Sequence, residues 1–235
     1  MREDQAAAMD QAIGHGDEAA LVALLADEPR LTGTPIPVQR DWGEEMWLGL
    51  HRAAASGAVG LVGLLLTAGA SIDARTRFRT PMHGRETALL IASRCGHLAV
   101  AELLLAHHAD AGLLDANHRS ALSQAAGGGH VEIVKQLIGA GAGVDAVDDQ
   151  QRTPLHWSIA GGHVDAALVL IEAGADVDHA CPREPGGFTP LHRCVSAGGA
   201  MSAVVERLIE AGADTTLRDP RFGMTADELA RASSA

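Results

Sequence analysis

Apolar residues between positions 153 and 178 fall at helical spacing in two short runs separated by glycine. Thr153 can cap the first helix with its hydroxyl, and Pro154 suits the first helical position, where an N–H donor would have no partner. Gly162 ends this helix, because a residue without Cβ adopts the left-handed conformation easily. A second helix ends at Gly174 and carries apolar residues at helical spacing, namely Ala167, Leu168, Leu170 and Ile171. The pattern predicts a unit of two helices followed by an extended turn.

This two-helix unit recurs along the chain. Leucines at the same place in the unit lie 33 residues apart at positions 89, 122 and 155. The next copy places Leu191 36 residues after Leu155, and an earlier copy places Leu50 39 residues before Leu89. Repetition at such a period is typical of a solenoid, in which each unit covers the apolar face of its neighbour. We therefore predict five repeats.

The segment before Leu89 offers two possible helix starts, Thr80 and Thr87. A start at Thr80 would place Leu89 where the unit needs its terminal glycine, whereas a start at Thr87 puts Gly96 there. The helix is therefore predicted to begin at Thr87. The turn before it, 74–86, is then longer than in a 33-residue unit by 39 − 33 = 6 residues.

Short motifs recur with the same period. T-P-L-H stands at 153–156 and 189–192, and G-A-D ends the second helix at 174–176 and 212–214. These residues resemble the ankyrin repeat, whose signature has the same T-P-L-H start and the same 33-residue period. The resemblance covers roughly residues 45–232. It implies an all-α solenoid of helix-turn-helix units joined by β-hairpin-like turns.

The departures from the repeat predict how the chain is organised. The two-helix rhythm near the N-terminus and the single helix near the C-terminus look like caps, which protect the open ends of a solenoid. Pro35 and Pro37 predict an irregular, extended connection after the first cap. We expect one domain over 1–235, with an N-terminal cap at about 5–31, the connection at 32–46, repeats at about 47–79, 86–118, 119–151, 152–187 and 188–221, and a C-terminal cap at about 222–232.

Composition favours helices and excludes several classes of partner. Hydrophobic residues make up 47% of the chain but aromatic residues only 3%, so the core consists mainly of Ala, Leu, Val and Ile. The formal net charge of −12 disfavours binding to nucleic acid or to an anionic membrane. The uncharged stretch 53–72 is interrupted by glycines and predicts a buried helix pair instead of a membrane span. No secretory signal pattern is recognisable, and the cysteines lack metal-ligand spacing, so we expect a cytoplasmic protein.

Arginines concentrate in the long turn. Arg75, Arg77 and Arg79 alternate with other residues, so an extended strand would place them on one face, and Arg85 follows nearby. Guanidinium groups offer paired donors, so these four residues, the arginine cluster, are a candidate contact for a carboxylate or a phosphate. The alternative is that they pair with the protein's own carboxylates.

The ankyrin resemblance implies a second binding surface, formed by the turn tips and the exposed face of the first helices. The tips hold large or charged residues, whereas the helix face is mostly small. Such a groove admits a side chain or a small ligand, although small residues also allow repeats to pack closely. Trp157 is predicted to pack between repeats. The candidate binding residues are Trp47, Arg75, Arg77, Arg79, Arg85, Glu86, Arg94, Cys95, Arg119, Asp149, Arg152, Phe188 and Met224.

The 12 histidines raise the question of catalysis or metal binding. Six of them occupy two fixed places in the repeat, where hydrogen bonds to neighbouring backbone are expected: His51, His97, His130, His156, His163 and His192. His107 and His108 point in different directions from a helix end, so we expect no metal and no cofactor. Cys95 beside Arg94 is a candidate nucleophile for which no base can be assigned.

The main hypothesis is a non-catalytic scaffold that binds another protein, of unknown identity, through its concave face and turn tips. Two alternatives remain open. One is an enzyme or small-molecule binder that uses the groove, and the other is a sensor of an acidic or phosphate-bearing ligand that uses the arginine cluster.

Overall fold

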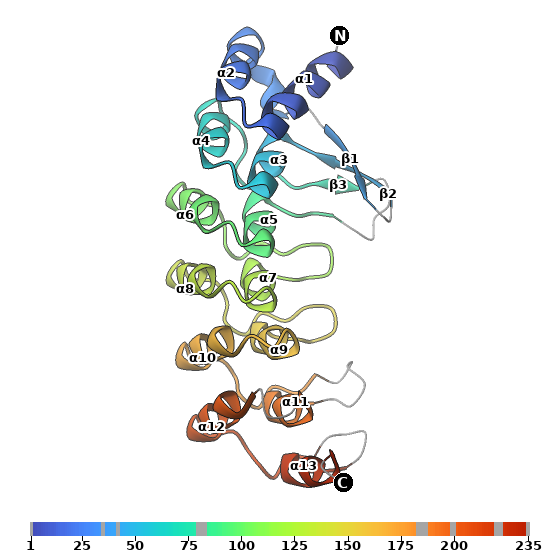
Figure 1. Ribbon diagram of the computed structural model, residues 1–235, viewed down its shortest axis with the longest axis vertical. Coiled ribbons are helices and arrows are strands. Elements are labelled where there is room, and N and C mark those ends of the chain that lie inside the picture. The colour runs from blue at the N-terminus through green and yellow to red at the C-terminus, as the bar shows by residue number, and fades with distance from the viewer. Residues whose placement is uncertain are drawn as a thin grey trace. The chain divides into compact units, whose positions relative to one another are not determined.

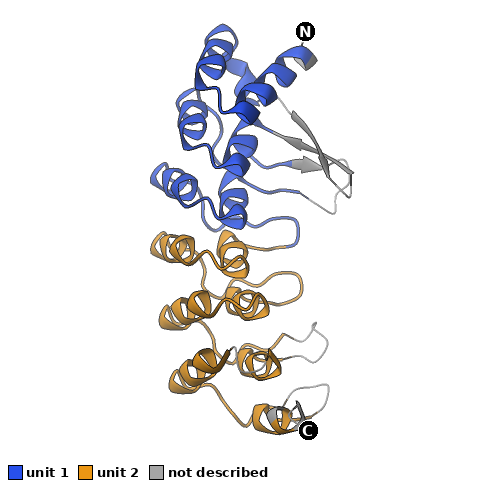
Figure 2. Cartoon of the chain, viewed as in Figure 1, with its two compact units in different colours: residues 1–117 blue, residues 118–235 orange. Residues whose placement is uncertain are grey.

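The computed structural model describes residues 2–33, 36–40, 43–78, 84–181, 188–197, 201–218 and 223–233. The chain divides into two compact units, unit 1 at residues 1–117 and unit 2 at residues 118–235 (Figure 2). In a solenoid each repeat contacts only its neighbours, so a division between two repeats is expected on physical grounds.

Unit 1 is built from helical pairs (Figure 1). Within each pair the two helices pack together, and the first helices α1, α3 and α5 pack in a row, as do the second helices α2, α4 and α6. A 3-10 helix, η1 (Pro29–Gly33), follows α2. The pairs are α1 (Arg2–His15) with α2 (Glu18–Asp27), α3 (Gly49–Ser56) with α4 (Val59–Thr67), and α5 (Ala88–Cys95) with α6 (Leu98–Ala106).

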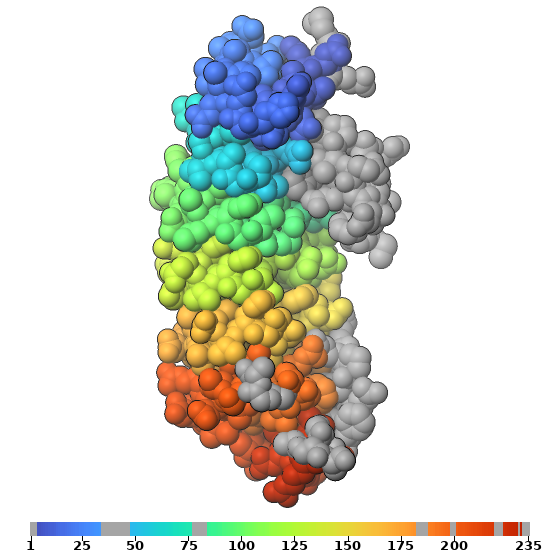
Figure 3. Space-filling view, in the orientation of Figure 1, coloured from blue at the N-terminus to red at the C-terminus, as the bar shows by residue number. Residues whose placement is uncertain are grey.

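Unit 2 repeats the same arrangement. Its first helices α7, α9, α11 and α13 pack in a row, and α8, α10 and α12 form the second row. Figure 3 shows that side chains fill the space between successive pairs within each unit. The bounds are α7 (Ala121–Gly127), α8 (Val131–Gly139), α9 (Pro154–Ala160), α10 (Val164–Glu172), α11 (Pro190–Ala197), α12 (Ser202–Glu210) and α13 (Ala226–Ser233).

The repeating helical pairs predicted from the sequence are confirmed. The predicted start of α5 is also correct, because Thr87 is its N-cap and accepts a hydrogen bond from the Leu90 N–H (3.3 Å). Gly96 ends that helix with a φ of 77°. The alternative start, Thr80, lies outside the described residues.

The connection predicted to be irregular instead contains a β-hairpin. Strands β1 (Ile36–Arg40) and β2 (Gly43–Trp47) pair antiparallel, with Arg40 opposite Gly43. β2 also pairs antiparallel with β3 (Arg77–Phe78), giving the order β1-β2-β3. β3 belongs to the long turn, so the two insertions into the repeat pattern pair with each other. Pro37 is tolerated because β1 is an edge strand, where a missing N–H breaks no ladder bond.

The leucine that defines the period is buried in every copy. Its exposed fraction is 3% or less at Leu50, Leu89, Leu122, Leu155 and Leu191. Burying a leucine side chain contributes about 2 kcal/mol, and each of these leucines lies in a first helix that packs against the next. The period in the sequence therefore follows the contacts between neighbouring pairs.

Ser93 in α5 departs from this apolar pattern. Its side chain is fully buried, and its hydroxyl finds no hydrogen-bond partner among the described residues. The same place in the neighbouring copies holds Ala54 and Ala126, both also fully buried. A buried hydroxyl without a partner loses its hydrogen bonds to water and gains nothing in return.

We predict that Ser93→Ala raises the free energy of unfolding by about 1 kcal/mol, because it removes this desolvated hydroxyl. Urea unfolding followed by circular dichroism measures the change. Ser123→Ala is the matched control, since the Ser123 hydroxyl lies 3.1 Å from that of Ser120. The control should lose stability, and equal effects of the two substitutions would argue that only helix propensity is involved.

The second helices end at a residue with positive φ. Glycine holds this place at Gly69, Gly141, Gly174 and Gly212, but His108 holds it after α6 with a φ of 64°. A residue with a Cβ is strained in the left-handed region, whereas glycine is not.

His108→Gly should therefore raise the free energy of unfolding by about 0.5–1 kcal/mol, the relief of strain exceeding the added chain entropy. The neighbouring His107 has a φ of −91°, so His107→Gly should lower stability instead. Denaturant unfolding of both variants checks the opposite signs. Destabilisation by both would contradict the strain at His108.

Candidate functional site

Buried histidines join the first helix of one repeat to the turn that leads into the next. His51 Nε2 donates to the Ala74 carbonyl (2.8 Å), His156 Nε2 to that of Phe188 (3.3 Å) and His192 Nε2 to that of Met224 (3.2 Å). A carbonyl only accepts, so each ring carries its proton on Nε2. His97 Nε2 likewise donates to a backbone carbonyl, that of Ala55 (3.0 Å). The backbone role predicted for the repeated histidines is confirmed for these four.

The same hydrogen bonds fix two predicted binding residues in place. The backbone of Phe188 is held by His156, and the ring of Phe188 stacks on His192 with 6.0 Å between centroids and 15° between planes. Met224 is held by the next histidine, His192. Both Phe188 and Met224 are half-buried.

The turn tips share a left-handed residue. Arg85, His118 and Gln151 have φ values of 60°, 56° and 62°, and each stands directly before a predicted tip residue, Glu86, Arg119 or Arg152. Buried aspartates anchor two of these turns: Asp115 accepts from the Asn117 N–H (2.8 Å), and Asp148 accepts from the Gln150 N–H (2.8 Å). Sequence reasoning missed these aspartates, although their 33-residue spacing was a usable signal.

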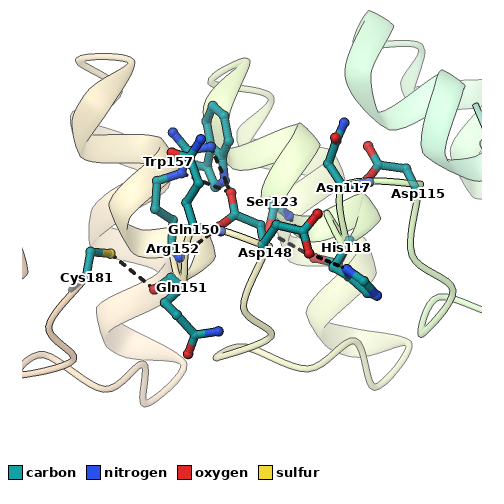
Figure 4. Close-up of polar contacts among 12 residues, drawn as sticks. Asp115, Asn117, His118, Ser123, Asp148, Gln150, Gln151, Arg152, Trp157 and Cys181 are labelled. Carbon is teal, nitrogen blue, oxygen red and sulfur yellow. Dashed lines mark hydrogen bonds and ion pairs between the residues drawn. The ribbon is translucent and has the colours of Figure 1, made fainter. Parts of the chain in front are cut away.

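Asp148 organises a group of side chains in unit 2. Its Oδ2 accepts from Arg152 Nε and from Arg152 Nη2, both at 2.9 Å, and from Trp157 Nε1 at 3.2 Å (Figure 4). The Arg152 guanidinium carbon lies 3.9 Å from the centre of the indole, and that of Arg119 lies 5.8 Å from it. We call Arg119, Asp148, Arg152 and Trp157 the tryptophan cluster.

The prediction that Trp157 packs within the core was wrong in part. The indole does rest on the neighbouring repeat, because a Cβ added to Gly127 would lie 3.3 Å from Trp157 Cε3. The side chain is nevertheless half-buried and not enclosed. The reason is that arginines at two successive tips stack on the indole, where the cation and the ring attract each other.

The cluster brings together two of the predicted binding residues, Arg119 and Arg152. Asp149 lies on the same turn as Arg152 but points elsewhere, to His118, whose Nδ1 is 2.5 Å from Asp149 Oδ1. Both partners of that pair are more than half exposed, at 62% for His118 and 52% for Asp149, so the pair contributes little to stability.

The predicted residues of unit 1 form a separate group. Arg94 Nε donates to Glu86 Oε1 (3.1 Å), and Arg94 Nη1 lies 4.0 Å from Cys95 Sγ. Arg75 Nη1 donates to the carbonyls of Leu114 (2.7 Å) and Arg85 (3.3 Å) and thus braces the long turn. The Arg85 side chain is exposed. The side chains of three further predicted residues lie outside the described part of the chain: Trp47, Arg77 and Arg79.

Within the described ranges, no three His, Cys, Asp or Glu side chains gather in a way that could hold a metal ion. A membrane crossing needs about 20 apolar residues in one helix, and the described helices include none of sufficient length and apolarity.

Burial lowers the pKa of His156 from 6.5 to about 4, with the Phe188 carbonyl acting in the opposite direction. Because the folded pKa lies below the unfolded one, the unfolded chain takes up the proton first as the pH falls. The contribution to stability is therefore complete above pH 6.5 and is lost as the pH falls from 6.5 to about 4.

Replacing His156 by Gln should make stability depend less on pH. The wild type should lose about 3 kcal/mol through this residue across the window, and the variant should not. Urea unfolding at several pH values between neutral and about 4 measures the slope, with the exposed His15→Gln as control. A variant slope equal to that of the wild type would exclude His156 as the titrating group.

Comparison with known proteins agrees with the repeat geometry. Residues 50–146, 89–181 and 122–219, three overlapping segments, match the family model described as Ankyrin repeats (3 copies). Among curated proteins, none matches the sequence. The matched segments include the helices from α5 to α12 and most of the tips described above. With its buried period leucines and its histidine bonds to neighbouring turns, the chain belongs to the ankyrin repeat family.

Proposed function

We propose that this protein is a non-catalytic scaffold that binds another protein through the tryptophan cluster and the adjacent turn tips of unit 2. Ankyrin repeats generally serve as protein-interaction modules. The observation that carries the proposal is the tryptophan cluster itself, in which one half-buried indole lies between tip arginines from successive repeats. Tryptophan and arginine are the residues most enriched among those that dominate binding energy at protein interfaces.

The cluster is also held in place before any partner arrives. Asp148 fixes Arg152 and Trp157 through the hydrogen bonds described above, and its own side chain is only 2% exposed. Side chains that are already ordered lose little conformational entropy when a partner binds. This rigidity supports a role in recognition.

The surroundings of the cluster leave room for a partner backbone. Ala160 and Gly161, which end α9, are exposed, and so is Gly128, which ends α7. Residues without large side chains allow close approach of another chain. By contrast, the exposed large hydrophobic residues among the described ones, Val22, Val59 and Ile209, stand singly on α2, α4 and α12, and single residues of this kind are common on protein surfaces.

Arg119→Ala should weaken binding of the native partner by roughly 30-fold, the effect of losing about 2 kcal/mol at an interface centre. The immobilised protein and its variant would capture proteins from a native cell extract, and the recovered proteins would be quantified by mass spectrometry. We expect a set of proteins that the wild type retains and the variant does not.

Arg207→Ala is the matched control, because Arg207 is an arginine of unit 2 on the second-helix row, with pairs to Glu172 and Glu210. It should retain the same proteins as the wild type. Trp157→Leu should behave like Arg119→Ala, provided that circular dichroism shows an unchanged helical content. Identical recovery by the wild type and by all three variants would reject the tryptophan cluster as the binding surface.

A further inference from the structure

We infer that the partner inserts a carboxylate side chain, Asp or Glu of a peptide segment, between the arginines of the tryptophan cluster. This inference rests on the proposed function, because it concerns the same surface, and it specifies the chemistry that the surface recognises.

The first argument is the charge around the indole. Two guanidinium groups lie within 6 Å of its centre, at 3.9 Å for Arg152 and 5.8 Å for Arg119, whereas the cluster contains one carboxylate, Asp148. A third arginine, Arg193, is close enough to act on His156 of the same helix as Trp157, as does Asp148. This surface is thus locally positive on a chain whose net charge is −12.

The second argument is the position of Asp148. Its Oδ1 accepts from the Gln150 and Arg152 N–H groups (2.8 and 2.9 Å), and its Oδ2 accepts from Arg152 and Trp157 side chains. The carboxylate therefore uses both oxygens inside the turn. It orients Arg152, but it cannot also turn outward to bind a group on a partner.

The third argument concerns which ligand charge fits. A cation over Trp157 would meet the repulsion of Arg152, which already stacks on the indole at 3.9 Å. A polyanion such as a nucleic acid would meet the net charge of −12 over the rest of the chain. A single carboxylate avoids both penalties, because its charge is small and its two oxygens accept from guanidinium donors in pairs.

The fourth argument is access for a peptide. Gly128, Ala160 and Gly161 are exposed beside the cluster, and they stand on α7 and α9, which pack against each other. A peptide backbone passing over these small residues would bring its side chains within reach of both arginines. A short acidic side chain suits this approach better than a bulky group.

The test uses pools of nonapeptides, with one fixed central residue and randomised flanks, bound to the full-length protein. The central residue is Glu, Asp, Gln, Asn, Lys or phosphoserine. The wild type should retain the Glu and Asp pools about fivefold more than the Gln and Asn pools, the advantage of a charge-assisted hydrogen bond. The preference should fade as the ionic strength rises from about 0.05 to about 0.3 M, because the site is partly exposed.

Arg119→Gln and Arg152→Gln should abolish the acidic preference, and Arg207→Gln should keep it. Equal retention of the Glu and Gln pools, no retention of any pool, or a stronger preference for Lys would overturn the inference. A stronger preference for phosphoserine would also overturn it in favour of a phosphopeptide. The extract capture with Arg119→Ala decides the proposed function separately. If that variant loses partners while the pools show no acidic preference, the scaffold stands and only the inference fails.

Discussion

Each helical pair of this protein must cover the apolar side of the next pair, because two helices of seven to nine residues cannot enclose a core alone. The leucine at the start of each first helix meets this requirement and is almost completely buried in every copy. The other regular features depend on it. Once the pairs are stacked, the histidine of one first helix can reach the turn of the next repeat, and the tips of successive turns come close enough for their side chains to meet.

The stacking also explains why the tryptophan cluster exists in one place. Trp157 rests on Gly127, the last residue of α7, where a larger side chain would compete with it for space. The left-handed residues His118 and Gln151 set the direction of the two following tips, so that Arg119 and Arg152 reach the same indole. The cluster is thus a product of repeat geometry and of the particular residues at three positions.

The regular part of the fold could be predicted from the sequence, because the information that specifies it repeats every 33 residues. The start of α5 at Thr87 and its end at Gly96 followed from phase alone. The sheet could not be predicted in this way, since β2 and β3 are paired segments from two separate insertions that appear once each. Trp157 was misjudged for a related reason: its exposure depends on arginines at two tips, and the period does not show which side chains meet there. Asp148 and Asp115 were within reach of the method, had their common spacing been weighed.

The hairpin formed by β1 and β2 has a consequence for self-association. A two-residue connection places Arg40 and Gly43 in a hydrogen-bonded pair, so the alternation along β1 directs the backbone of Pro37 away from β2. Proline has no N–H to offer on that outer side, and the row of donors along the open margin of the sheet is interrupted. A second molecule that tried to add its own strand there would find an incomplete template, which protects an otherwise helical protein from growing sheets between its copies.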